Sequence, residues 1–288
     1  MKQPTRHHPK LLALILAAAL LQGCATVDKS TKVNPNSPNA CRVAEHNSAP
    51  ALGMCAAQNF PAENFGAVMP VMRALKKSNK GVGAIVLSTK WPNGSVLKVA
   101  FMDDPYHLQD RVLAVANEWN TRGRANITFQ KSSIAESDIR VSFFGTGYWS
   151  YLGRQALRFP KDEQTLNLHF SPGVSNTELR RVVLHEFGHA LGLMHEHEQP
   201  LADIHWDKEA AYRHFMAPPN CWSRNQVDAQ VLAKERAGPN IASTNFDPNS
   251  IMCYPVSADL TTDHHAIGWN TDLSTTDVEF ISRQYPMH

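Results

Sequence analysis

The residues best suited to chemistry are two histidines four positions apart and the glutamate that follows the first. Helix positions i and i+4 lie on one face, because an α-helix has about 3.6 residues per turn. The imidazoles of His185 and His189 can therefore reach one Zn²⁺ at about 2.0–2.1 Å. The carboxylate of Glu186 reaches beside such a metal and not onto it. This position suits a general base that activates a zinc-bound water molecule.

A glycine and a third histidine extend this motif. Gly192 can adopt the positive φ that ends a helix and turns the chain sharply. We expect the turn to bring His195 to the metal as the third ligand. Three protein ligands leave one position open for water, which is typical of a catalytic zinc site. A helix that is merely rich in histidine would not be expected to match all five positions of the motif.

A second segment, Ser-Ile-Met-Cys-Tyr-Pro at residues 250–255, lies downstream in a loop region. A methionine turn of this kind accompanies the extended zinc motif. Met252 is then expected to form an apolar floor beneath the histidines. The alternative is a methionine that only fills a gap in the core.

These motifs resemble those of the metzincin metallopeptidases, and among them the astacin-like branch. The resemblance covers about residues 90–288. Glu196, directly after His195, matches this branch. Tyr254, two residues after Met252, matches a tyrosine that binds zinc in the resting enzyme and swings off to hydrogen-bond the tetrahedral oxyanion. The resemblance implies a zinc-dependent endopeptidase, with Zn²⁺ as cofactor and a peptide or protein as substrate.

Other parts of the chain fit this resemblance less closely. Residues 91–94 resemble the entry to an astacin domain, and residues 149–154 resemble the edge strand over the cleft, where an extended substrate can pair. Cys253 departs from the pattern, since astacins usually carry histidine there. In astacins the counterpart of Glu196 can pair with a freed N-terminus. A long segment precedes the domain here, so a solvated or hydrogen-bonded carboxylate is an equal alternative.

Two other functional interpretations stay open at this point. One is a non-catalytic zinc-containing lipoprotein that binds a peptide or a cell-envelope partner. Glu186 favours the enzyme, because a binding protein has no need of a general base. The other is an enzyme that stays latent until residues 25–90 are cut, although the Phe-x-Gly-Asp motif of astacin pro-segments does not occur there.

The elements that must position these residues alternate between strand and helix. Ser175 and Glu178 predict a capping box that opens the helix carrying the zinc motif. Alternating apolar residues over 165–170 predict a half-buried strand. Strands are expected at 95–102, 127–131, 138–144, 148–152 and 165–170, and helices at 107–122, at 175–191 and after Ser274, where Asp277 completes a second capping box.

The expected fold class is therefore α/β (α+β). We expect a metzincin-like catalytic domain built on a mostly parallel twisted sheet with an antiparallel edge strand. An active-site helix and an irregular C-terminal subdomain, closed by a final helix, complete it.

The N-terminus resembles that of a bacterial lipoprotein. Three basic residues precede an apolar run at 11–21, which is too short to span a bilayer as a mature helix. The sequence Leu-Gln-Gly-Cys at 21–24 resembles a lipobox, which implies cleavage before Cys24 and lipidation of its thiol. An ordinary secretory signal is the alternative. The expected layout is a lipoprotein signal peptide at 1–23, a lipid-anchored polar tether at 24–59, a segment at 60–90 that could be helical, and the zinc peptidase domain at 91–288.

This layout defines the expected location and partners. The chain would be lipid-anchored in the cell envelope, at the outer membrane and facing the periplasm or the exterior. Cleavage removes three positive charges and changes the formal net charge from +2 to −1. The partners are then the membrane, through the anchor, and a peptide or protein substrate, with no indication of a nucleic acid.

Four cysteines remain after lipidation, and disulfides persist in an exported chain. They are Cys41, Cys55, Cys221 and Cys253, and they allow three pairings. The most local set is Cys41–Cys55 with Cys221–Cys253, and the other two sets stay open. None of these cysteines has the spacing of a cysteine zinc site.

Overall fold

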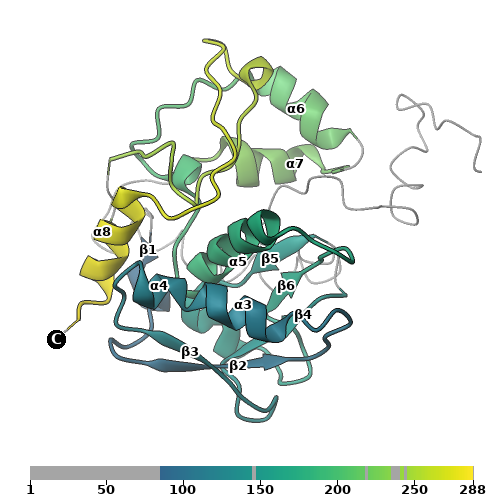
Figure 1. Ribbon diagram of the computed structural model, residues 1–288. Helices are drawn as coiled ribbons and strands as arrows, with labels where there is room; N and C mark the ends of the chain where they lie inside the picture. Colours follow the sequence, from purple (N-terminus) through teal and green to yellow (C-terminus); the bar gives the residue numbers. More distant parts are fainter. Residues whose placement is uncertain (1–84, 145–146, 218–219, 235–240, 243–244, 288) are drawn as a thin grey trace, which may run out of the picture. The chain divides into compact units, whose positions relative to one another are not determined.

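A five-stranded sheet with helices packed against it is the framework of the computed structural model (Figure 1), which describes residues 85–144, 147–217, 220–234, 241–242 and 245–287. The strand order is β3-β2-β4-β6-β5, parallel except for the edge strand β5. The predicted fold class, a mostly parallel sheet with an antiparallel edge strand, is confirmed. The strands are β2 (Val96–Phe101), β3 (Thr128–Lys131), β4 (Ile139–Ser142), β5 (Tyr148–Ser150) and β6 (Leu166–Leu168).

Strand β6 differs from the prediction of a half-buried strand. Leu166, Asn167 and Leu168 are all buried, because β6 lies between β4 and β5 and both of its faces are covered. The amide of Asn167 satisfies part of its hydrogen-bonding capacity by donating to the carbonyl of Gly147, at 2.6 Å. Buried polar groups need such partners, so this contact also ties the start of the edge strand to its neighbour.

The first predicted helix is divided in two. Helix α3 (Gln109–Ala116) and helix α4 (Glu118–Thr121) are separated by Asn117. The Asn117 side chain accepts from the Phe129 N–H and donates to the Phe129 carbonyl, each at 2.9 Å. It thereby pairs with the outer edge of β3, the first strand in the sheet order. An edge strand has free backbone groups, and this side chain satisfies a pair of them.

Helix α5 (Asn176–Ala190) carries the first half of the zinc motif and packs on the sheet. The Ser175 hydroxyl caps it by accepting from the Glu178 N–H, at 3.1 Å. Phe187 meets Phe129 edge to face with ring centroids 4.9 Å apart, an arrangement worth about 0.5–1.5 kcal/mol beyond burial. Trp119 donates from its indole to the Leu184 carbonyl, at 2.9 Å. These contacts hold α5 against the sheet.

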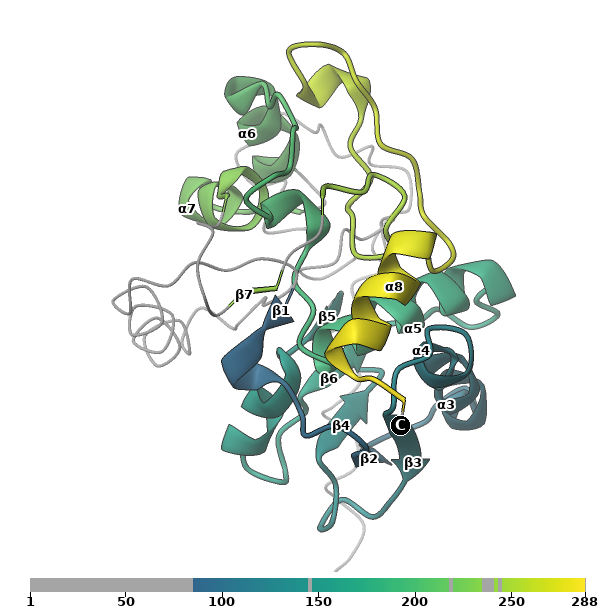
Figure 2. The same cartoon turned by 90° about the vertical axis from the view of Figure 1, so that its left-hand side faces the viewer.

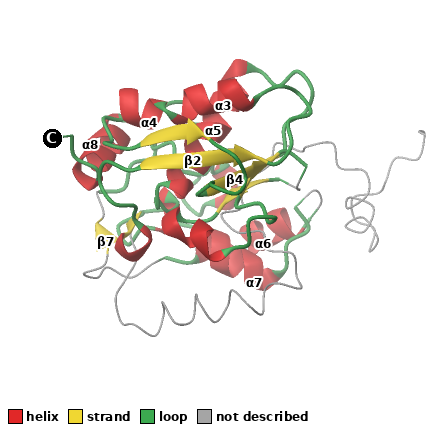
Figure 3. Ribbon diagram, turned by 90° about the horizontal axis from the view of Figure 1, so that it is seen from below, coloured by secondary structure: helices red, strands yellow, loops and turns green. Residues whose placement is uncertain are grey.

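The C-terminal part contains more helix than the sequence predicted. Figure 3 shows α6 and α7 as a group separate from α3, α4 and α5. Asp207 caps α6 by accepting from the Ala210 N–H, a signal that the surrounding loop residues obscured. The remaining elements are α6 (Lys208–Met216), α7 (Arg224–Val227), a π-helical turn (Asp228–Leu232), α8 (Thr275–Gln284), strands β1 (Ile85–Val86) and β7 (Ile241–Ala242), and 3₁₀ turns at Leu87–Thr89, Gly153–Arg158, Glu196–Glu198 and Ala258–Leu260.

The folded domain extends upstream of Trp91. Strand β1 pairs with β7 in a separate two-stranded sheet, as Figure 2 shows, and the Ile85 side chain is fully buried. Residues 85–90 therefore pack with the domain, although the sequence pattern assigned them to the preceding segment. The signal peptide, the tether and Cys24 lie outside the described residues. Within the described part of the chain, no helix is long and apolar enough to cross a membrane.

The most local disulfide pairing is wrong. Cys253 is a free, buried thiol packed in the hydrophobic cluster of α6 and α7, whereas Cys221 is disulfide-bonded. Cys41 and Cys55 lie outside the described residues. Nearness in sequence did not predict the pairing, because Cys253 is buried among apolar side chains of the core.

Replacing Gly192 by alanine is expected to destabilise the protein. Gly192 follows α5 with φ of +100°, and an added Cβ would lie 3.3 Å from Thr89 Oγ1. Such a backbone costs a non-glycine residue about 1–3 kcal/mol, or roughly 2–12 °C in Tm. Thermal unfolding measures the loss. The control is Gly268→Ala, because no heavy atom lies within 4 Å of the added Cβ. An equal decrease in Tm in the two variants would show that the backbone conformation of Gly192 is not the cause of the destabilisation.

Candidate metal centre

Three histidines from two segments converge beside the Met-turn. His185 and His189 lie on consecutive turns of α5, and the turn at Gly192 brings His195 back toward them. One ring nitrogen from each lies within 4.8 Å of the others. The Nε2 atoms of His189 and His195 are 3.1 Å apart, close to the separation of about 3.3 Å that two nitrogens on one tetrahedral zinc would have. All three side chains are buried.

The outer nitrogens of two rings define their tautomers. His185 Nδ1 lies 2.7 Å from the Ile251 carbonyl, and His189 Nδ1 lies 2.8 Å from the Leu193 carbonyl. A carbonyl only accepts, so both Nδ1 atoms carry the hydrogen and both Nε2 atoms present a lone pair. Among the described residues His185 Nε2 has no hydrogen-bond partner. Lone pairs that converge in a buried place fit a cation.

Burial also keeps these histidines in the form that binds metal. It lowers the pKa of His189 to about 4, and it lowers the pKa of His185 and His195 well below the usual range. The neighbouring imidazoles depress the pKa of His185 and His195 further, because two positive charges would repel. Neutral imidazole is the form that zinc requires.

Met252 lies under the zinc motif, against the backbone of α5. A Cβ added to Gly188 would come within 2.5 Å of the Met252 sulfur and 3.1 Å of the Trp119 ring. Gly188 stands between the two helical histidines, and its missing side chain makes room for the methionine. The sequence analysis did not single out Gly188, although its place within the motif is a signal that could have found it.

The Met-turn is anchored from the C-terminal helix. The Asp277 carboxylate accepts from the Ser250 hydroxyl at 2.6 Å and from the Ile251 N–H at 2.8 Å. The carbonyl of Ile251 is the one that holds His185. Burial raises the pKa of Asp277, and these hydrogen bonds act in the opposite direction by stabilising its charged form. Asp277, which completes the capping box of α8, thus positions the first histidine through a single residue of the turn.

Tyr254 lies within the same cluster of rings. Its ring centroid is 4.2 Å from that of His195 and 4.5 Å from that of His197, on which it stacks. His197 lacks helical spacing with the zinc motif, so the sequence pattern did not place it at the site. It is buried, and its Nε2 contacts the Gln230 carbonyl at 3.0 Å. The repeated His-Glu pattern at residues 195–198 was the available signal.

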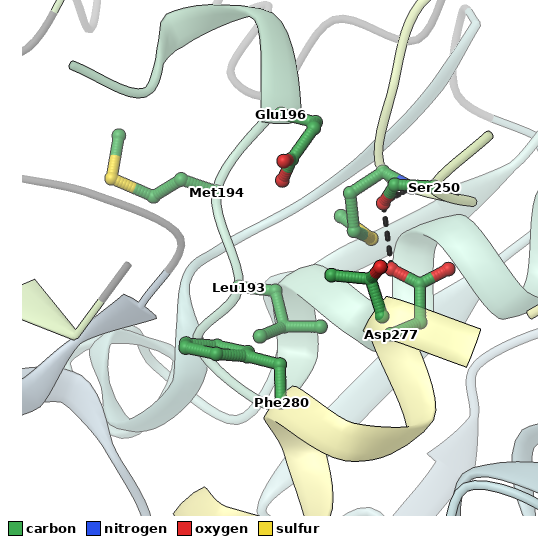
Figure 4. A pocket seen from close by; sticks show the side chains of 8 residues that line it. Leu193, Met194, Glu196, Ser250, Asp277 and Phe280 are labelled. Atoms are coloured by element: carbon green, nitrogen blue, oxygen red, sulfur yellow. Dashed lines mark hydrogen bonds between the residues drawn. The ribbon is translucent and has the colours of Figure 1, made fainter. Parts of the chain in front are cut away.

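Glu196 is a buried, hydrogen-bonded carboxylate. It accepts from the Asp247 N–H at 3.0 Å and from the side-chain amide of Gln199. Burial, the largest influence, raises the pKa of Glu196 to about 8. Glu196 and Asp277 both line a small pocket (Figure 4), with Leu193, Met194, Ser250, Met252, Thr276 and Phe280. None of the three histidines lines this pocket, so it is distinct from the metal centre.

A second group of possible ligands overlaps the first. His195, His197 and Glu198 also bring ligand atoms within 4.8 Å of one another. The two groups share His195, and a neutral imidazole has a single lone pair to offer. The cluster of His185, His189 and His195 is therefore the metal centre of the described residues.

Glu186 and the edge strand complete the surroundings of this centre. Glu186 is fully buried on α5, next to His185. Strand β5, which begins at Tyr148, contacts helix α5, which carries Glu186. Burial and nearby carboxylates raise the pKa of Tyr148 to about 12. The site thus combines a buried carboxylate, three neutral imidazoles and an edge strand.

Comparisons with known proteins agree with this geometry. The family model of the astacin peptidases matches residues 84–286. A structure of myroilysin is 43% identical with a TM-score of 0.68 and covers 72% of this chain and 100% of that chain. A crystal structure of myroilysin is 41% identical, with a TM-score of 0.54. The match covers 69% of this chain and 87% of that chain. High choriolytic enzyme 1, a hatching enzyme zinc-protease from Oryzias latipes (medaka fish), is 18% identical, with a TM-score of 0.50. The match covers 72% of this chain and 100% of that chain. At this identity the likeness supports the fold alone.

No curated protein matches the chain. The family match nevertheless covers most of the chain, and it includes the three histidines, the Met-turn and the whole described sheet. The chain therefore belongs to the astacin family of peptidases and is a zinc metalloendopeptidase with a metzincin-like fold.

Proposed function

We propose that this zinc peptidase cleaves peptide bonds with a water molecule that Glu186 deprotonates. The observation that carries the proposal is a fully buried carboxylate on α5, one residue from His185 and therefore beside the three-histidine centre. When bound, zinc supplies a Lewis acid that polarises the scissile carbonyl and lowers the pKa of water. The residues that hold it are His185, His189 and His195.

Glu186 acts first as base and then as acid. It takes a proton from the water as the water oxygen bonds to the carbonyl carbon. It then gives this proton to the peptide nitrogen as the C–N bond breaks, so that the products are a carboxylic acid and an amine. The burial of Glu186 supports both steps, because charges interact more strongly where water is excluded.

The substrate is proposed to bind as an additional strand. Strand β5 is at the end of the sheet order and pairs antiparallel with β6 on its inner side. An extended peptide can pair with the outer side of such an edge strand through main-chain hydrogen bonds. Strand β5 contacts helix α5, which carries Glu186 and two of the histidines, so a peptide on this strand would pass close to the metal centre.

Tyr254 is proposed as a zinc ligand in the resting enzyme and as the donor to the oxyanion during turnover. Its ring lies against that of His195, whose Nε2 converges with the Nε2 of His189. A hydroxyl that stabilises developing negative charge in a dry site contributes a few kcal/mol to catalysis. The ring of His197, stacked on Tyr254, supports the position of the tyrosine.

We further propose that the chain is a lipoprotein held in the cell envelope through Cys24. The lipobox-like residues 21–24 support this, as do the short apolar run before them and the polar composition of residues 24–59. In this layout the catalytic domain works outside the cytoplasm, at the end of a tether.

Glu186→Gln is expected to keep zinc and fold but to lose activity by several orders of magnitude, because glutamine cannot accept the proton. Cleavage of an unfolded protein by the purified mature chain, at equal zinc content, measures this. The matched control is Glu279→Gln, which removes an exposed carboxylate from α8 and should leave activity unchanged. Near-normal turnover by Glu186→Gln would show that Glu186 is not the general base.

Tyr254→Phe is expected to lower kcat by about 100-fold with little change in KM, because only the transition state loses a hydrogen bond. Steady-state kinetics and zinc content after dialysis are the measurements. Tyr106→Phe, at a partly exposed tyrosine, is the control. If Tyr254→Phe loses its zinc on dialysis, Tyr254 is a structural ligand and not an oxyanion donor.

Cys24→Ser is expected to prevent lipidation and to move the exported protein from the membrane to the soluble fraction. Labelled palmitate incorporation and membrane fractionation in a bacterial host test this. Thr26→Ala leaves the lipobox intact and should behave as the wild type. A wild-type chain that takes up no label and stays soluble would contradict the anchor.

A further inference from the structure

The three zinc histidines differ in what holds their outer nitrogens. A zinc-bound histidine needs an acceptor for its other ring N–H, which fixes the ring and strengthens the ligand. For His185 and His189 this acceptor is a backbone carbonyl, at 2.7 and 2.8 Å. For His195 no hydrogen-bond acceptor lies at Nδ1 among the described residues.

A carboxylate stands at this position instead. Glu198 Oε1 lies 3.6 Å from His195 Nδ1, within ion-pair distance and slightly beyond a hydrogen bond. The His195 side chain is fully buried and that of Glu198 is 11% exposed, so little water separates or screens the two groups. The 3₁₀ turn at Glu196–Glu198 creates this proximity, because it folds residue i+3 back over residue i.

We propose that Glu198 is the positioning residue for the third zinc ligand. Its carboxylate accepts the Nδ1–H of His195, holds the tautomer whose Nε2 binds zinc, and raises the affinity of the site for the metal. The inference rests on the zinc site and not on the role of Glu186.

Charge explains why an anion suits this place. Zinc and three neutral imidazoles leave two positive charges in surroundings from which water is excluded. A carboxylate in contact with one imidazole offsets part of this charge more strongly than a neutral carbonyl can. His195 also comes from a turn, whereas the other two ligands are held by helix α5. The ligand that lies outside helix α5 is thus the one whose outer nitrogen faces a carboxylate.

The neighbouring His197 does not fill this role. Its Nε2 is engaged with the Gln230 carbonyl, at 3.0 Å, and its ring stacks on Tyr254. Nor does Glu198 complete a second metal site with His195 and His197, because His195 has one lone pair and presents it to the first site. The contact between Glu198 and His195 Nδ1 therefore positions His195 as a ligand of the catalytic zinc.

The test compares Glu198→Gln and Glu198→Ala with Glu209→Gln in the full zinc-loaded chain. Glu209 is an exposed carboxylate paired with Arg224, so its variant has the same loss of charge away from the site. Competition with a chromogenic chelator should show zinc affinity about 10–100-fold weaker in both Glu198 variants. Glu209→Gln should match the wild type. Cobalt substitution should shift the visible absorption bands in the Glu198 variants alone.

Two outcomes would contradict a positioning role for Glu198. Unchanged zinc affinity and an unchanged cobalt spectrum in both Glu198 variants would overturn the inference. A lower Tm of the metal-free protein, without a change in zinc affinity, would make Glu198 a structural residue of the turn. Zinc affinity is measured without turnover, and Glu186→Gln is expected to keep its zinc. Failure of this inference is therefore distinguishable from failure of the proposed mechanism.

Discussion

The structure depends on keeping three imidazoles neutral, buried and directed at one point. Each ring loses hydration on burial, and each must present a lone pair to the same small volume. This arrangement is unfavourable without a cation, because ring nitrogens that have lost their hydration then face one another at short distance. The scaffold must therefore impose the arrangement through contacts on the outer side of each ring.

One of those contacts comes from a part of the chain far from the motif, and another comes from within the motif. The Ile251 carbonyl holds His185, and Asp277 holds the Ile251 N–H from the start of α8. The Leu193 carbonyl, placed by the turn at Gly192, holds His189. Helix α8 thus helps to aim the first of these side chains through the Met-turn. A peptidase domain of this kind cannot easily be shortened at its C-terminus, since the last helix supports the first ligand.

Local patterns predicted the main elements because their causes are local. Ser175 caps α5 by accepting from the N–H of its third neighbour, and Ser274 caps α8 in the same way. The prediction was less accurate where a distant residue decides the outcome. Asn117 divides a helix by pairing with β3, and β6 is buried on both faces by its place in the strand order. Whether Cys253 forms a disulfide likewise depends on the core residues that surround it.

The sequence by itself determined that His185, His189 and His195 form one cluster beside the carboxylate of Glu186, because helical spacing and one glycine turn bring them together. Only the tertiary structure decided which acceptors hold the outer nitrogens, that Met252 fills the space left by Gly188, and that His197 stacks on Tyr254. Spacing along a helix specifies which side chains share a face. It carries no information on what a folded chain places behind them, and that outer layer determines tautomer, orientation and charge.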